Sequence, residues 1–290
     1  MKILITGTTG MLGSYLVKHL QKKYKIFSTG RSKKFKTSHN NYLSFDLKLD
    51  DYDQLYNWSK PNIVIHCAAL TDVDYCEKNH EETFFVNIES ISKIIKKFQS
   101  SKIIYISTDA VFDDLNQLHK EEDKVNPLNI YGKSKLSAEN ILVKNSNNFT
   151  IIRTTPIGFN FSQPNFLTWI INSLELDKKI GLFTDVYFTP IDVWNLVKHV
   201  ENVIDKDFSG IWHISGLDRI SKYEFGLEIC NTLKYNKNLI KKNSIDEVNL
   251  FSKRSKNQSL DCSKYMKVSK LKLPNTFEII NNIKYHYIKK

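Results

Sequence analysis

The sequence predicts an α/β fold with a doubly wound parallel sheet and a smaller C-terminal lobe. Two observations support this prediction. Short apolar runs alternate with helical patterns through the first half of the chain, as they do where helices cover both faces of a parallel sheet. Two of these runs, residues 62–66 and 102–106, are almost continuously apolar, which is typical of strands buried on both sides.

The expected elements follow a regular order before residue 153. We expect strands at residues 3–5, 25–28, 42–45, 62–66, 102–106 and 149–153. The helical patterns between them cover residues 11–20, 51–58, 81–99 and 133–143.

The pattern loosens after residue 153. We expect helices at residues 166–176, 193–204, 222–233 and 277–288, and a short strand at 211–215. Residues 234–259 are rich in Lys and Asn and weakly patterned, which indicates a surface segment. We therefore divide the chain into residues 1–153 and 154–290, and expect the second part to return strands to the main sheet.

Composition and charge narrow the class of protein. The 290 residues are 41% hydrophobic and 25% charged, as in an ordinary globular protein. Lys and Arg number 42 against 31 Asp and Glu, which gives a net charge of +11. The lysines are scattered, and no nucleic-acid-binding motif is present, so we do not expect a nucleic-acid partner. A basic surface would still attract phosphate-rich ligands.

Cysteine spacing and hydropathy point to an intracellular protein. Cys67, Cys76, Cys230 and Cys262 form no C-x-x-C pair and no zinc-type cluster with His, so we expect free thiols and no metal site. No apolar run reaches transmembrane length, and the first residues suit a strand better than a signal peptide. The expectation is a cytoplasmic protein without a membrane partner.

A glycine motif follows the first expected strand. Gly7, Gly10 and Gly13 lie between the apolar run 3–5 and a helical face that begins at Met11. In this context Gly7 would form a tight turn, Gly10 would let the backbone approach a pyrophosphate, and Gly13 would let the helix pack closely on the sheet. The helix N-terminus would present free N–H groups to the phosphates. The motif predicts dinucleotide binding, and the alternative is a plain surface turn.

The loop after the second strand indicates which dinucleotide binds. An NAD site would place an acidic side chain here, for the ribose 2′-hydroxyl. This chain offers Arg31, Lys33 and Lys34, which suit a 2′-phosphate. We therefore expect NADPH, with NADH possible. The alternative is a loop that is merely basic.

Other polar or small residues follow the third and fourth strands. Asp46 and Leu47 come after the third strand, where a carboxylate could accept from the adenine amino group. Ala68 and Ala69 would let the chain pass close to the cofactor, or could serve tight core packing. Asn87 is a polar residue on a mostly apolar helix face. It could brace a strand end, cap a helix or face solvent.

The fifth strand and the helix after it carry candidate catalytic groups. Thr108 comes just after the strand, and Tyr131 and Lys135 are four residues apart, so they share one helix face. A phenol has a pKa of about 10, too high for easy proton exchange near neutrality. A lysine ammonium about 4 Å away would contribute roughly 4 kcal/mol at an effective dielectric constant of about 20, which would lower the pKa of Tyr131. Thr108 would hydrogen-bond a carbonyl oxygen that Tyr131 protonates.

Longer segments resemble one protein family over nearly the whole chain. They occupy residues 61–74, 106–112, 126–135, 188–192, 210–216 and 257–263. With the glycine motif, they resemble the extended short-chain dehydrogenase/reductases, which have a Rossmann-type fold, and within them the dTDP-4-dehydrorhamnose reductase group.

The resemblance implies a reaction and a set of site residues. The reaction is hydride transfer from NADPH to the 4-keto group of a nucleotide-linked deoxysugar, as in the synthesis of a surface polysaccharide. The implied catalytic set is Thr108, Tyr131 and Lys135. The implied cofactor contacts are Gly7, Gly10, Met11, Leu12, Arg31, Asp46, Leu47, Ala68, Ala69, Asn87, Tyr131 and Lys135. The implied substrate contacts are Thr71, Asp109, Thr154 and Arg254, and a homodimer is a possible assembly.

Three departures from the reductase pattern lie on the substrate side. Ala110 stands where a Tyr is usual, residues 155–157 lack the common aromatic, and the basic segment 253–257 is altered. The non-aromatic stretch 153–157 and a further run at residues 260–264 also resemble the regulatory beta subunit of methionine adenosyltransferase. That resemblance implies an alternative, a dinucleotide-binding subunit that regulates a partner enzyme without catalysing a reaction itself.

Overall fold

The computed structural model describes residues 1–33, 41–114, 117–160 and 164–289. Within these residues the main sheet has seven strands, all parallel, in the order β11-β6-β5-β4-β1-β2-β3. The order turns back beside β1, so the sheet is doubly wound, as predicted. The strands are β1 (Lys2–Thr6), β2 (Lys25–Gly30), β3 (Tyr42–Ser44), β4 (Ile63–His66), β5 (Lys102–Thr108), β6 (Phe149–Thr154) and β11 (Gly210–His213).

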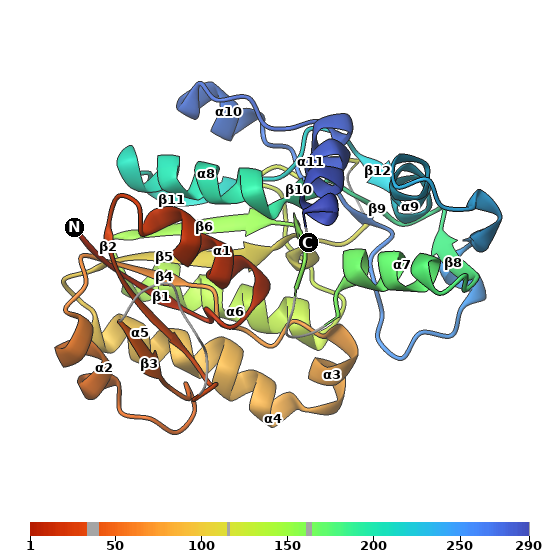
Figure 1. Ribbon diagram of the computed structural model, residues 1–290. Helices are drawn as coiled ribbons and strands as arrows, with labels where there is room; N and C mark the ends of the chain where they lie inside the picture. Colours follow the sequence, from red (N-terminus) through yellow and green to blue (C-terminus); the bar gives the residue numbers. More distant parts are fainter. Residues whose placement is uncertain (34–40, 115–116, 161–163, 290) are drawn as a thin grey trace.

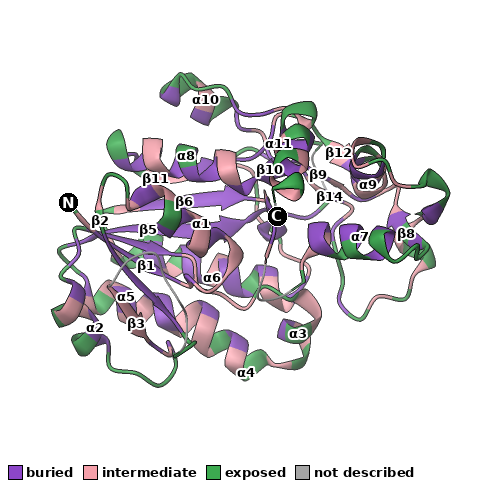
Figure 2. Cartoon of the chain, in the orientation of Figure 1, coloured by how far each residue is buried: buried purple, intermediate pink, exposed green. Residues whose placement is uncertain are grey.

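Helices cover both faces of this sheet, which gives three layers (Figure 1). On one face lie α1 (Met11–Leu20) and α8 (Val193–Asp205), and on the other lie α2 (Tyr52–Ser59), α5 (Ser90–Lys97) and α6 (Ile130–Asn145). The alternation of side chains along β1 assigns the two cores. Ile3 and Ile5 pack towards α1 and α8, whereas Leu4 packs towards α2 and α5. Figure 2 shows the strands buried and the outer helix surfaces exposed.

The C-terminal part builds a separate lobe beyond the carboxyl ends of the strands (Figure 1). Its core is apolar and consists mainly of residues after 156. Its helices are α7 (Phe166–Glu175), α9 (Lys222–Thr232) and α11 (Thr276–Ile288), and α10 (Ser263–Ser269) lies against β11. Its short strands are β7 (Pro156–Ile157), β8 (Ile180–Phe183), β9 (Tyr187–Phe188), β10 (Ile191–Asp192), β12 (Ile220–Ser221), β13 (Ile240–Asn243) and β14 (Asn257–Gln258).

Most predicted elements occur within a few residues of their expected bounds, and some details differ. The expected helix at residues 81–99 contains α4 (His80–Thr83), a π-helical stretch (Phe84–Glu89) and α5. The weakly patterned segment 234–259 contributes β13 and β14, and α3 (Val73–Lys78) was not expected. Strand β11 pairs with β6, so part of the chain after residue 153 completes the main sheet. The boundary at residue 153 itself stays a prediction.

No helix in the described part of the chain is both long and apolar enough to span a bilayer. The four cysteines are unpaired, and all but Cys67 are buried.

A buried ion pair joins α6 to two strands of the sheet. The Arg153 side chain at the end of β6 donates to both carboxylate oxygens of Glu139 on α6, at 2.7–3.2 Å. The Ser107 hydroxyl on β5 also donates to Glu139. Both charged side chains are at least 96% buried. Removing one partner of such a pair leaves the other charge buried and uncompensated.

Substitution Glu139→Ala should therefore destabilise the fold by about 3–5 kcal/mol, because Arg153 stays buried without its carboxylate. Urea unfolding followed by circular dichroism measures this. The control is Asp53→Ala, which breaks a largely exposed ion pair with Lys97 and should cost less than about 1 kcal/mol. Equal losses for the two variants would contradict the structural role of Glu139.

Candidate functional site

The glycine turn after β1 is built by two close backbone approaches. Gly7 has φ +71°, and a Cβ on it would lie 2.6 Å from the Ala68 Cα and backbone N. A Cβ on Gly13 would lie 2.4 Å from the Gly7 carbonyl oxygen. Gly13 therefore packs the helix against the turn itself, where the sequence predicted packing on the sheet. Both positions exclude larger residues, so the turn is pinned between α1 and the end of β4.

The start of α1 offers a cradle of backbone groups. Gly10 is the N-cap residue and supplies no side-chain cap, so the first N–H groups of the helix have no intrahelical partner. Met11 and Leu12 are the first two residues of the helix, and the Leu12 side chain is buried in the core. Leu12 can therefore offer a ligand only its backbone. Unpaired N–H groups with a glycine at the cap fit a pyrophosphate.

Arg31 lies directly after β2, at the carboxyl end of the sheet. Its side chain is 63% exposed and forms an ion pair with Glu82 of α4, at 3.7 Å. Lys33 is also exposed, and Lys34 lies outside the described residues. A basic side chain here fits the predicted 2′-phosphate. The acidic partner Glu82 was not foreseen, since it lies about fifty residues away in the sequence.

Asp46 and Leu47 occupy the turn after β3. The Asp46 carboxylate accepts from the Lys48 backbone N–H at 2.9 Å, so it already stabilises the local turn. Leu47 is 8% exposed and packs in the core under α2. Contact of either residue with an adenine stays a prediction.

The segment after β4 is held in place by Asn87. Ala68 contacts the glycine turn, and Ala69 is half-buried beside it. The Asn87 amide accepts from the Leu70 N–H at 2.8 Å and donates to the Leu70 carbonyl at 3.0 Å and to Ser134 at 2.9 Å. Asn87 thus braces the strand end. Its predicted contact with the cofactor is untested.

The N-terminus of α6 approaches the end of β5 very closely. A Cβ on Gly132 would lie 2.3 Å from the Ala110 carbonyl oxygen, so only glycine fits there. Asn129 caps the helix by accepting from the Gly132 N–H at 2.9 Å, and its amide donates to the Lys253 carbonyl. The helix begins three residues earlier than predicted, which puts Tyr131 in its first turn. This approach brings Tyr131 beside Thr108.

The expected lowering of the Tyr131 pKa is wrong in direction. Burial raises the pKa of Tyr131 well above its ordinary value, and the charge of Asp109 raises it further. A hydrogen bond with Thr108 lowers it, but the effect of burial dominates. Tyr131 and Lys135 share a helix face, but the Lys135 ammonium donates to the Ile106 carbonyl and not to the Tyr131 phenol.

Lys135 is buried under the sheet end. Its ammonium donates to the Ile106 carbonyl at 2.7 Å and lies 4.0 Å from the centroid of the Tyr105 ring. Burial lowers the pKa of Lys135 to about 7, and the Glu139 carboxylate opposes this shift. Lys135 is therefore close to its titration point near neutral pH.

The predicted substrate contacts differ in burial and in their partners. Asp109 is buried next to Thr108 and accepts from the Thr108 hydroxyl at 3.0 Å and from the Thr155 hydroxyl at 2.6 Å. Burial raises the pKa of Asp109. Thr154 is buried with a hydroxyl that has no partner within the described residues. Thr71 is exposed, and Arg254 is ion-paired with Asp74 at 3.2 Å.

Three residues near the site were missed by the sequence argument. At the end of β4, the His66 ring forms hydrogen bonds with the Thr6 hydroxyl through Nδ1 and with the Ser90 hydroxyl through Nε2. Burial lowers the pKa of His66 to about 3, so its ring is neutral. Glu139 follows Lys135 by four residues, a spacing that could have signalled it. Lys222 lies on α9, some ninety residues after Lys135, and no local sequence pattern links it to the site.

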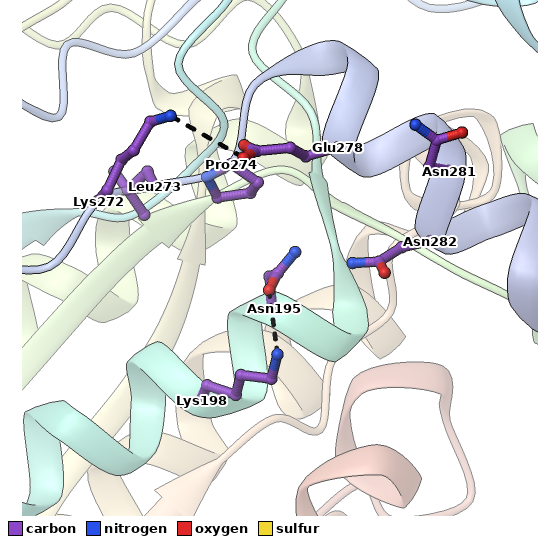
Figure 3. Close-up of a pocket in the computed structure, with 8 residues that line it drawn as sticks. All are labelled: Asn195, Lys198, Lys272, Leu273, Pro274, Glu278, Asn281 and Asn282. Atoms are coloured by element: carbon purple, nitrogen blue, oxygen red, sulfur yellow. Dashed lines mark hydrogen bonds and ion pairs between the residues drawn. The ribbon is translucent and has the colours of Figure 1, made fainter.

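A separate hollow lies between α8 and α11 (Figure 3). It is polar, and none of the predicted site residues lines it. Its lining residues are Asn195, Lys198, Lys272, Leu273, Pro274, Glu278, Asn281 and Asn282. The described part of the chain holds no cluster of three or more His, Cys, Asp or Glu residues that could bind a metal.

Comparison with known proteins identifies the family. The family described as "RmlD substrate binding domain" matches residues 1–285. The chain belongs to this family. A dTDP-4-dehydrorhamnose reductase of Bacillus anthracis, solved in complex with NADP, superposes over the whole of both chains with a TM-score of 0.86 and 26% identity. The resemblance stated from sequence and the predicted fold are both confirmed.

Two curated relatives of this RmlD-family chain have different roles. A probable low-salt glycan biosynthesis reductase of Haloferax volcanii is 27% identical over 279 residues, covering 91% of this chain and 90% of that protein. Methionine adenosyltransferase 2 subunit beta of Bos taurus is also 27% identical, covering 91% of this chain and 81% of that protein. Membership of the RmlD family therefore leaves two classes of function open.

The low pKa of Lys135 predicts how its replacement affects stability. An ordinary lysine keeps its proton up to about pH 10.5, whereas folded Lys135 loses it near pH 7. Burying the charged Lys135 therefore lowers the free energy of unfolding by its full amount below pH 7. This loss shrinks as the pH rises from 7 to 10.5, because the folded protein then holds the lysine neutral while the unfolded chain still protonates it. Lys135→Met should gain stability relative to wild type at pH 6, and this relative gain should be smaller at pH 9.

Thermal and urea unfolding at the two pH values measure the difference. Lys144→Met, on the exposed last turn of the same helix, is the control and should show no such trend. A stability difference for Lys135→Met that is identical at pH 6 and pH 9 would contradict the assigned burial effect.

Proposed function

We propose that this protein is an NADPH-dependent reductase that acts on the 4-keto group of a nucleotide-linked 6-deoxysugar. The observation that carries the proposal is the juxtaposition of Thr108 and Tyr131 at the carboxyl end of β5, with Lys135 one helical turn below. The likeness to dTDP-4-dehydrorhamnose reductases supports it. A cytoplasmic location and a role in surface polysaccharide synthesis are parts of the same proposal.

The cofactor would lie across the strand ends on either side of the glycine turn. The backbone at Gly10, Met11 and Leu12 would hold the pyrophosphate, and Arg31 would bind the 2′-phosphate. The NADP in the Bacillus anthracis reductase supports this choice, and NADH remains an alternative. When bound, NADPH supplies the hydride that reduces the sugar carbonyl carbon.

The protein's own groups supply the proton and the orientation. Tyr131 keeps its proton at neutral pH because burial raises its pKa, and a proton donor must be in this state. The Thr108 hydroxyl, which donates to Asp109 in the structure, would turn to donate to the same carbonyl oxygen and stabilise the negative charge that develops there. Lys135 would hold the nicotinamide ribose through its buried ammonium.

A second candidate is a dinucleotide-binding regulatory subunit without catalytic turnover. The similarity to the methionine adenosyltransferase beta subunit over 91% of this chain favours it. The Thr108, Tyr131 and Lys135 set is intact, which favours the enzyme, although such a set can persist without turnover.

The deciding experiment follows oxidation of NADPH, and separately of NADH, with a panel of dTDP-, UDP- and GDP-linked 4-keto-6-deoxysugars. Turnover with one member supports the reductase and identifies its sugar. Tight binding of NADPH with no turnover on any member supports the regulatory candidate, and capture of a partner methionine adenosyltransferase would then test it.

Substitution Tyr131→Phe should lower kcat by about 10²- to 10⁴-fold, because it removes the proton donor. Affinity for NADPH, measured by fluorescence titration, should change little. Tyr56→Phe is the control and should retain full turnover, because Tyr56 lies on α2, which leads into the amino end of β4. Wild-type activity in Tyr131→Phe would exclude this residue as the proton donor.

Substitution Arg31→Asp should shift preference from NADPH towards NADH. It removes the cation for the 2′-phosphate and places a second carboxylate near Glu82. The ratio of kcat/KM for NADPH to that for NADH should fall by about 10- to 100-fold, the usual value of a charge-assisted hydrogen bond. Lys25→Asp, at the opposite end of β2, is the control. An unchanged ratio in Arg31→Asp would show that Arg31 does not bind the 2′-phosphate.

A further inference from the structure

A cation on the substrate side has no role in the mechanism above. Lys222 is the first residue of α9, and its ammonium lies 3.3 Å from the centroid of the Phe188 ring and 4.7 Å from that of Phe166. Among the described residues the Lys222 ammonium makes these ring contacts and donates no hydrogen bond. Burial lowers the pKa of Lys222 to about 8.

The Lys222 side chain is half-buried, and its ammonium has no acceptor among the described residues. An ammonium carries three N–H donors, and aromatic faces compensate only part of the cost of taking it out of water. A half-buried ammonium without a protein acceptor loses part of its hydration without gaining a hydrogen bond in return. An anionic oxygen of a ligand would supply what the protein does not.

The neighbouring charges indicate where that ligand lies. The Asp109 carboxylate stabilises the charged form of Lys222, whereas the Arg254 guanidinium destabilises it. Arg254 is itself held by Asp74. Lys222 therefore interacts electrostatically with a second cation from a distant part of the chain, and a bound anion would offset their repulsion.

The position of Lys222 is fixed by its own element. Ser221 and Glu224 form a capping box, in which the Ser221 hydroxyl accepts from the Glu224 N–H at 3.1 Å and the Glu224 carboxylate accepts from the Ser221 N–H at 2.9 Å. The Lys222 N–H donates to the Val186 carbonyl at 2.9 Å. The start of α9 is thus tied to the strand that carries Phe188, so the cation is preorganised.

The position of Lys222 relative to Thr108 indicates which part of a substrate it could contact. Asp109, which interacts with Lys222, accepts a hydrogen bond from the catalytic Thr108. Figure 1 shows α9 in the lobe beyond the carboxyl ends of the strands. The cation therefore lies on the side of Thr108 that faces the C-terminal lobe, where the proposed function places the sugar.

We propose that Lys222 binds the sugar-proximal phosphate of the nucleotide diphosphate carried by the substrate. This inference rests on the proposed function. A 6-deoxysugar is itself neutral, so the phosphate on its C1 oxygen is the anionic group nearest to the reacting carbonyl. The occupant of the Lys222 site is then common to all sugar nucleotides of this class.

The test measures binding of nucleoside diphosphates and the matching nucleoside monophosphates to the NADPH-loaded protein by calorimetry. Lys222→Met should weaken binding of the diphosphate by about 10- to 100-fold and leave the monophosphate nearly unchanged. Lys222→Arg keeps the charge and should restore part of the loss. Lys242→Met, a lysine over the Tyr223 ring on exposed β13, is the matched control and should bind as wild type.

The outcomes separate this inference from the proposed function. If the wild type binds none of the diphosphates, the proposed function fails and the inference fails with it. If the wild type binds one and Lys222→Met binds it equally well, only the inference is overturned. Selective loss of a nucleotide-linked uronic acid in Lys222→Met, with diphosphate binding intact, would assign the cation to a sugar carboxylate and also overturn it. Unchanged NADPH affinity in every variant shows that the fold is retained.

Discussion

The buried Glu139 carboxylate joins the three elements that build the candidate site at the carboxyl end of the sheet. It lies on α6, accepts from Arg153 at the end of β6 and from Ser107 on β5, and favours the charged form of Lys135 one turn earlier. Thr108 follows Ser107, and Tyr131 begins the helix that Glu139 holds. The distance between Thr108 and Tyr131 therefore depends on one ion pair that is shielded from water, and whose loss leaves a buried charge.

Burial shifts the pKa values of Tyr131 and Lys135 in opposite directions. Each neutral form is favoured by removal from water, which raises the pKa of Tyr131 and lowers that of Lys135. A phenol that holds its proton suits protonation of a substrate oxygen, whereas a lysine near its titration point still donates to the Ile106 carbonyl. The simple electrostatic picture of a lysine acidifying a neighbouring tyrosine fails here because the ammonium is directed to the strand carbonyl.

Sequence reasoning succeeded where the pattern is local. Alternating apolar runs predicted the order of strands and helices, and the carboxyl ends of parallel strands meet at one edge, so Thr108 and the glycine turn were placed correctly. It failed where contacts join distant segments. Glu82 beside Arg31 and Lys222 beside Asp109 have no signature in their own neighbourhoods. The side-chain direction of Lys135 also needs packing information, because a shared helix face fixes neighbours but not hydrogen bonds.

Two of the three departures from the reductase pattern lie around Asp109 and Lys222. Thr155, in the segment that lacks an aromatic, binds Asp109, and Asp109 interacts with Lys222. The altered basic segment supplies Arg254, whose positive charge also lowers the pKa of Lys222. Ala110 stands where the chain passes Gly132. The cofactor half keeps its glycine turn, whereas Asp109, Thr155, Lys222 and Arg254 bring together charges and a hydroxyl from both halves of the chain.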